Sequence, residues 1–80
     1  MEPLILKNNQ YSVLVVESLS GILLKTDFER YTWEGKTHHI FNNENLALKF
    51  INDMLVKVEG YDFSMYNSKG EYLYTINKDT

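Results

Sequence analysis

A chain of 80 residues without cysteine has room for one small core and lacks the disulfides, thiolate metal ligands and nucleophiles that a thiol supplies. Its apolar fraction of 44% and formal net charge of -3 are typical of a folded globular protein and exclude disorder by composition. The seven lysines and the single arginine are scattered, which argues against the basic surface that nucleic-acid binding needs. We therefore expect one domain over residues 1–80, in which residues 1–10 are the part expected to be least well ordered.

The longest apolar runs, at residues 4–6, 13–16 and 22–24, are far shorter than the roughly 18 residues that span a bilayer. Glu2 stands where a secretory signal would carry positive charge, and no small-residue cleavage site follows an apolar run. These features predict a cytoplasmic protein that does not cross a membrane. The many asparagines and lysines are associated with AT-rich genomes, so we expect a bacterial or phage-encoded chain, acting in the host cytoplasm in the second case.

The first part of the chain contains three candidate strands. A short strand is expected at residues 4–6, before a polar run with turn chemistry. Residues 11–17 are rich in β-branched side chains, and residues 22–26 are expected to be their antiparallel partner. These last two strands are the expected centre of a sheet.

A second hairpin is predicted where polar and apolar residues alternate more clearly. Its strands are residues 28–33 and 36–41, and Glu34 and Gly35 supply a two-residue turn between them. This pattern adds two more strands to the expected sheet.

One amphipathic helix is predicted at residues 43–58. Asn42 and Asn43 are both good N-cap residues, and Glu44 lies in the first turn, where a negative charge complements the helix dipole. Lys57 in the last turn and Gly60 just beyond it are typical of a helix C-terminus. The residues expected on its apolar stripe are Leu46, Ala47, Phe50, Ile51, Met54 and Leu55.

Two further strands are expected at residues 61–67 and 71–77, joined by a turn that places Gly70 in a left-handed conformation. With that turn Tyr66 lies opposite Tyr72, and the register divides the hairpin into two faces. The face expected against the helix contains Tyr61, Phe63, Met65, Leu73 and Thr75. The opposite face contains Asp62, Ser64, Tyr66, Tyr72, Tyr74 and Ile76. Its three tyrosines form either an interaction surface or a second small core under another strand or the N-terminal segment.

The predicted fold is therefore an α+β domain. It is a twisted antiparallel β-sheet of about six strands in the order ββββαββ, in which the short segment at residues 4–6 is not counted, with the amphipathic helix packed on one face.

No residue pattern points to catalysis, a cofactor or a metal. His38 and His39 are the only histidines, and neighbouring side chains of a strand point to opposite faces, so their rings are not expected to share one ion. Glu17, Glu29 and Glu34 are candidates for acid or base chemistry only because every short chain contains some carboxylates. We predict a protein that is not an enzyme and has no cofactor.

The function expected of such a chain is a non-enzymatic, small protein-binding module. It would be an inhibitor, immunity or adaptor protein that occludes a larger protein, and it has the potential to form a homodimer. The residues predicted to make the protein contact are Tyr66, Tyr72, Tyr74, Trp33 and Tyr31.

Two other classes of function stay open at this point. A nucleic-acid-related protein would use either Trp33 to stack a single-stranded base or the acids Asp27, Glu29 and Glu34 to imitate phosphates. A homo-oligomeric structural protein would bury its tyrosine face or an unpaired strand edge against a second copy.

Overall fold

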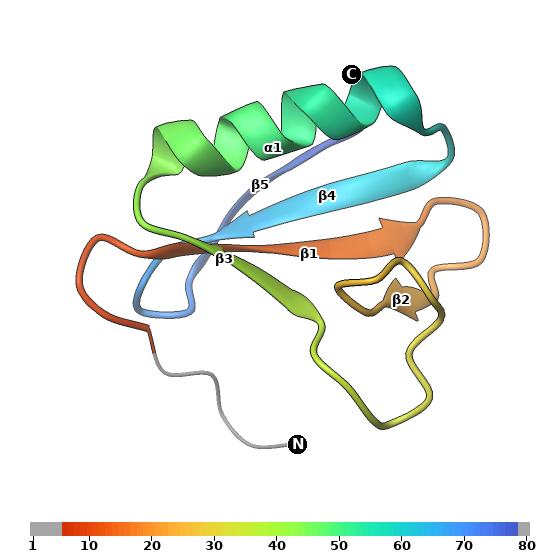
Figure 1. Cartoon of the computed structure of the whole chain (residues 1–80), viewed down its shortest axis with the longest axis horizontal. Helices are drawn as coiled ribbons and strands as arrows, with labels where there is room; N and C mark the ends of the chain where they lie inside the picture. The colour runs from red at the N-terminus through yellow and green to blue at the C-terminus, as the bar shows by residue number, and fades with distance from the viewer. Residues whose placement is uncertain (1–5, 79–80) are drawn as a thin grey trace.

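The structure, a computed structural model, describes residues 6–78 as a five-stranded antiparallel sheet with one helix across one face (Figure 1). The elements in chain order are β1 (Tyr11–Glu17), β2 (Leu23–Leu24), β3 (His38–Phe41), α1 (Glu44–Lys57), β4 (Tyr61–Tyr66) and β5 (Tyr72–Ile76). The predicted α+β class is confirmed. The order is βββαββ, one strand fewer before the helix than expected.

Strand β1 is the centre of the sheet. Along one edge it pairs with β4, which in turn pairs with β5. Its other edge is shared, because β3 pairs with the first half of β1 and β2 pairs with Val15 and Val16. The predicted antiparallel pairing of residues 22–26 with β1 is thus confirmed, although only two of those residues form the strand.

The predicted hairpin of residues 28–33 and 36–41 is wrong. Residues 28–33 form no strand, and only the end of the second segment does, as β3, which pairs with β1 instead. Phe28 and Trp33 have φ angles of 68° and 74°, in the left-handed region that an extended strand does not use. Most of the segment in which polar and apolar residues alternate is therefore part of a loop, residues 25–37, between β2 and β3. We call this loop the 25–37 connection.

The expected first strand at residues 4–6 falls largely outside the described residues. Leu6, its one described residue, is not in a strand.

Helix α1 begins and ends as predicted. The Asn43 side chain caps it by accepting a hydrogen bond from the N–H of Leu46 at 2.8 Å, and Val58 closes the other end. Leu46 itself is 46% exposed, contrary to expectation. The fully buried apolar core comprises Val13, Val15, Leu24, Ala47, Ile51, Phe63 and Met65.

The turn between β4 and β5 also forms as predicted. Gly70 has a φ angle of 79°, its N–H donates to the carbonyl of Asn67 at 3.0 Å, and Tyr66 pairs with Tyr72. Immediately beyond that pair the register shifts, because Leu73 is an extra residue on β5 and Tyr74 lies opposite Met65.

This bulge reverses the predicted faces of β5. Ile76 lies opposite Phe63 on the helix side, and Thr75 lies opposite Ser64 on the other side. The assignment of Leu73 and Thr75 to the core face is wrong, because one added residue shifts every later side chain to the opposite face. Tyr61, Phe63 and Met65 do share the face of the core, as expected.

We expect Ile51→Ala to lower the free energy of unfolding by about 2–4 kcal/mol, because it removes a fully buried side chain from the contact between helix and sheet. Leu46→Ala is the matched control on the same helix and should cost less than about 1 kcal/mol. Urea denaturation followed by circular dichroism measures both. Equal losses would contradict the orientation of α1.

Candidate functional site

The predicted tyrosine surface is divided by the bulge in β5. Tyr66 and Tyr72 meet edge to face with ring centroids 5.8 Å apart, and Tyr72 is 57% exposed. Tyr74 lies on the helix side, where its hydroxyl donates to Oε2 of Glu44 at 3.0 Å. Partial burial and this hydrogen bond raise the pKa of Tyr74. Tyr74 therefore joins the first turn of α1 to the sheet. The tyrosine surface that remains on the other face consists of Tyr66 and Tyr72, which we call the tyrosine pair.

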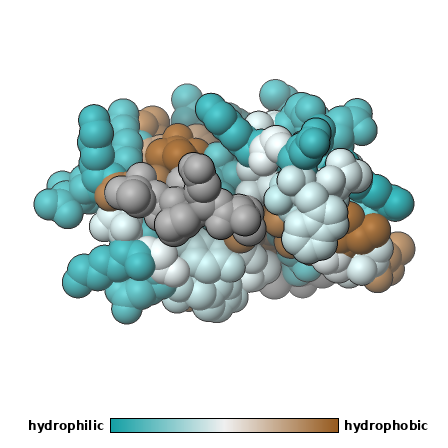
Figure 2. Space-filling model, turned by 90° about the horizontal axis from the view of Figure 1, so that it is seen from below, coloured by the Kyte–Doolittle hydropathy of each residue, from teal (hydrophilic) through white to brown (hydrophobic). Residues whose placement is uncertain are grey.

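Beside the tyrosine pair runs a row of hydroxyl groups. The Thr75 hydroxyl contacts the hydroxyl of Tyr72 at 2.8 Å and that of Ser64 at 2.9 Å. Figure 2 views the molecule from the side away from α1 and shows hydrophobic side chains reaching the surface among polar ones. Rings with polar tips over a hydroxyl row make a surface suited to both apolar and hydrogen-bonded contacts.

The other predicted aromatic residues do come together. Tyr31 and Trp33 lie edge to face with ring centroids 5.8 Å apart, on the 25–37 connection. Trp33 is 86% exposed, so almost none of its large apolar ring is covered by the described chain. Its φ angle of 74° is a genuine outlier for a bulky residue, and such strain often marks a functional position.

The 25–37 connection is fixed to the sheet by its own backbone. The N–H of Tyr31 donates to the carbonyl of Leu23 at 2.9 Å, and the N–H of Thr26 donates to the carbonyl of Lys36 at 2.8 Å. Phe28 is turned inward, 5.8 Å from the ring of Tyr61 and 5.7 Å from that of His39. The side chain of Phe28 therefore holds the 25–37 connection against the sheet. The strand prediction missed this role, which a large apolar residue among polar neighbours could have indicated.

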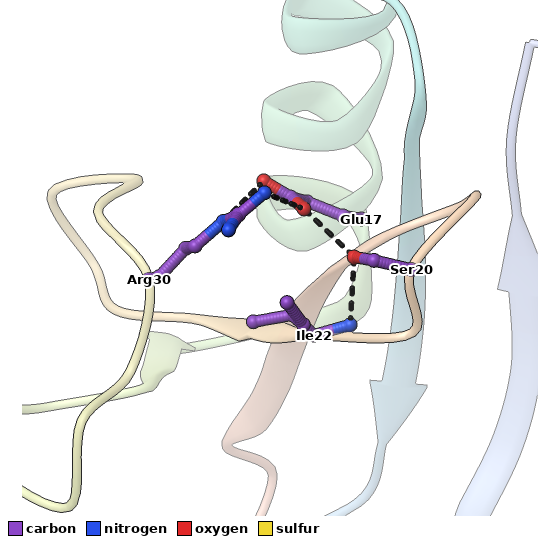
Figure 3. Close-up of polar contacts among 4 residues, drawn as sticks. All are labelled: Glu17, Ser20, Ile22 and Arg30. Carbon is purple, nitrogen blue, oxygen red and sulfur yellow. Dashed lines mark hydrogen bonds and ion pairs between the residues drawn. The ribbon is translucent and has the colours of Figure 1, made fainter.

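A polar network holds the outer side of the same connection (Figure 3). Arg30 reaches back to β1 and donates to both carboxylate oxygens of Glu17, at 3.1 and 3.3 Å. The Ser20 hydroxyl donates to Glu17 at 2.7 Å and accepts from the N–H of Ile22 at 3.2 Å. The hydrogen bond from Ser20, followed by that from Arg30, lowers the pKa of the Glu17 carboxyl. One carboxylate therefore ties the β1–β2 turn to the 25–37 connection.

Arg30→Gln should loosen the 25–37 connection without unfolding the protein, since exposed ion pairs contribute little to global stability. We expect amide hydrogen exchange in residues 26–36 to accelerate by about two- to five-fold. Lys78→Gln is the control, because it removes the ion pair with Glu59 and leaves this network intact. Unchanged exchange in the Arg30 variant would show that the network does not hold the connection.

The two histidines lie on opposite faces of β3, as the sequence predicts for neighbours in a strand. His39 pairs with Val13 and stacks on Phe50 with ring centroids 4.7 Å apart, and His38 pairs with Leu14. Nδ1 of His38 and Nε2 of His39 are buried with no hydrogen-bond partner among the described residues. Burial lowers the pKa of both rings, and the neighbouring charge of His38 lowers that of His39 further.

This arrangement makes stability depend on pH in a defined direction. The unfolded chain, whose histidines titrate at about 6.5, takes up protons before the folded chain does, so acid favours unfolding. We expect the free energy of unfolding to be greatest above about pH 6.5 and to fall as the pH is lowered toward 5. His39→Phe should reduce this fall in denaturation curves recorded at each pH. An identical fall in variant and wild type would contradict the burial of His39.

The remaining acids of interest lie along the same connection. Asp27, Glu29 and Glu34 are exposed, and Asp27 forms an ion pair with Lys25 at 3.7 Å. Within residues 6–78, no group of three or more histidine, aspartate or glutamate residues is placed to hold a metal ion. Over the same range, α1 is too short and too polar to cross a membrane.

Comparison of the chain with protein-family models, curated proteins and solved structures finds no match.

Proposed function

We propose that this protein is a small, non-enzymatic binding module that occludes a functional surface of a larger protein, as an inhibitor, immunity or adaptor protein does. The observation that carries the proposal is Trp33, which is 86% exposed on a connection fixed to the sheet. An exposed tryptophan leaves a large apolar area in water, and a partner that covers this area gains binding free energy from its burial. Tryptophan is also among the residues most enriched at the energetic centre of protein interfaces.

The fixation of the 25–37 connection supports a binding role. Ordering a loop at the moment of association reduces affinity, so a loop already held by its contacts presents its anchor at lower cost. Phe28 holds the inner side, and Arg30 holds the outer side through Glu17. Trp33 and Tyr31 are then displayed by a connection whose position is set by the rest of the fold.

Charges beside Trp33 would orient the partner. Lys25 and Asp27 neutralise one another, as do Arg30 and Glu17. Glu29, Glu34 and Lys36 are exposed on the same connection, and exposed charges of this kind act mainly on the rate and direction of approach. The tyrosine pair, Tyr66 and Tyr72, is a second and smaller contact surface in this proposal, and Tyr74 is a structural residue.

The chemistry around the histidines supports a non-enzymatic role. A general acid or base needs a neighbour that exchanges its proton with a substrate or a relay. The ring contacts of His39 are with Phe28 and Phe50, which exchange no proton, and its neighbour His38 lies on the opposite face of β3. In this proposal the chain acts by shape and contact, and its composition favours a bacterial or phage origin.

Trp33→Ala should weaken binding of the partner by about thirty-fold or more, the effect of truncating a central interface residue. Val56→Ala is the matched control, because Val56 is 83% exposed on α1, outside the 25–37 connection, and its variant should bind as the wild type does. The partner is first captured from bacterial lysate and purified, and its affinity for each variant is then measured by calorimetry.

Two results would contradict the proposal. One is equal affinity of the Trp33 and wild-type proteins for the captured partner. The other is capture that nuclease treatment abolishes and that falls steeply with salt, which would assign the chain to nucleic-acid binding instead.

A further inference from the structure

The outer edge of β5 has no strand beside it among the described residues. In the sheet order β2-β1-β4-β5, strand β5 is terminal and pairs only with β4. An antiparallel strand directs alternate backbone N–H and C=O groups to its two sides, so one set on β5 points away from the sheet. Such an edge is a template for another strand.

Strand β5 has little of the protection that edge strands usually carry. Its sequence, YLYTI, contains no charge and no proline, which are the common means of preventing edge pairing. The bulge at Leu73 interrupts the start of the edge but leaves Tyr74, Thr75 and Ile76 in regular register with β4. This regular segment is the part available to a partner.

The segment is complementary to itself when two copies run antiparallel. With Thr75 opposite Thr75 of the second copy, Tyr74 of each chain lies opposite Ile76 of the other. Aromatic residues opposite β-branched ones, and threonine opposite threonine, are both favourable cross-strand pairs. Tyr74 and Ile76 lie on the helix side of the sheet, so both mixed pairs would extend the existing core face.

The charges at the two ends of β5 agree with the same orientation. Glu71 precedes the strand and Lys78 follows it, and both are exposed. Because the bulge places both Tyr72 and Leu73 where a regular strand has one residue, Glu71 lies three strand positions before Thr75, and Lys78 lies three after it. Antiparallel pairing centred on Thr75 therefore brings Glu71 of each chain beside Lys78 of the other, whereas parallel pairing would bring like charges together. The present ion pair of Lys78 with Glu59, at 2.7 Å, is exposed and is exchanged at little cost.

We propose that a second copy of this chain pairs with β5 along its edge, through a two-fold axis at Thr75, to form a dimer with one continuous sheet. Both helices then lie on the same side of that sheet. Because β2 and β3 occupy the opposite edge of each copy, the two 25–37 connections lie at the far ends of the dimer. The dimer is independent of the binding role of Trp33 and would present that residue twice.

The test uses charge at the two-fold axis, where each side chain faces its own copy. Thr75→Lys and Thr75→Asp each place like charges opposite one another and should weaken the dimer by about tenfold or more. An equal mixture of the two variants places opposite charges together and should restore it. Light scattering after gel filtration, over a range of concentrations, gives the mass of each sample, and circular dichroism confirms that each variant is folded.

A second pair of variants keeps Thr75 and its hydroxyl contacts unchanged. Glu71→Lys alone should weaken the dimer, and the double variant Glu71→Lys, Lys78→Glu should restore it, because the opposite charges meet again with their places exchanged. A wild-type protein that is monomeric at every concentration overturns the proposal. So does a dimer that survives all the single substitutions, or folded single variants whose mixture stays monomeric.

Discussion

The rest of the structure depends on β1 being able to pair along both of its edges. It receives β4 on one side and both β3 and β2 on the other, so three strands take their positions from seven residues. Val13 and Val15 of β1 meet Met65 and Phe63 of β4, and these side chains form one buried cluster with Ala47 and Ile51 of α1. Helix α1 runs along the same side of both strands (Figure 1). In a chain of this size the contact of β1 and β4 with α1 provides most of the core. The loops between these elements are held in place because the strands and the helix fix their ends.

The elements that could be predicted from the sequence are those with local signals. Asn43 specifies the start of α1 through its own side chain, and Gly70 specifies the turn through its φ angle, so neither depends on the rest of the fold. The bulge at Leu73 has no such signal. It arises because placing Tyr74 and Ile76 on the helix side buries more apolar surface than placing Leu73 and Thr75 there, a comparison that requires the packed sheet.

The 25–37 connection is the part of the fold for which the sequence pattern predicted the wrong structure. Polar and apolar residues alternate there as in a strand, yet Phe28 turns inward while Trp33 stays outside. What decides the outcome is competition for the second edge of β1, which β3 and β2 divide between them. Of the predicted site, the pairing of Tyr66 with Tyr72 was within reach of the sequence, because the turn fixes it. Tyr31 and Trp33 also meet, but on a loop and not on the predicted strand. The change of face of Tyr74 followed from the bulge.

The position of β1 also has a consequence for how the chain folds. Its partner β4 comes from the other end of the sequence, so the central pair of the sheet joins segments that leave the ribosome far apart in time. Until β4 has been synthesised, one edge of β1 has unpaired backbone N–H and C=O groups, and α1 has only part of the surface on which it packs. Closing so long a segment costs entropy before the pairing contributes any stability, which makes this step the natural barrier to folding.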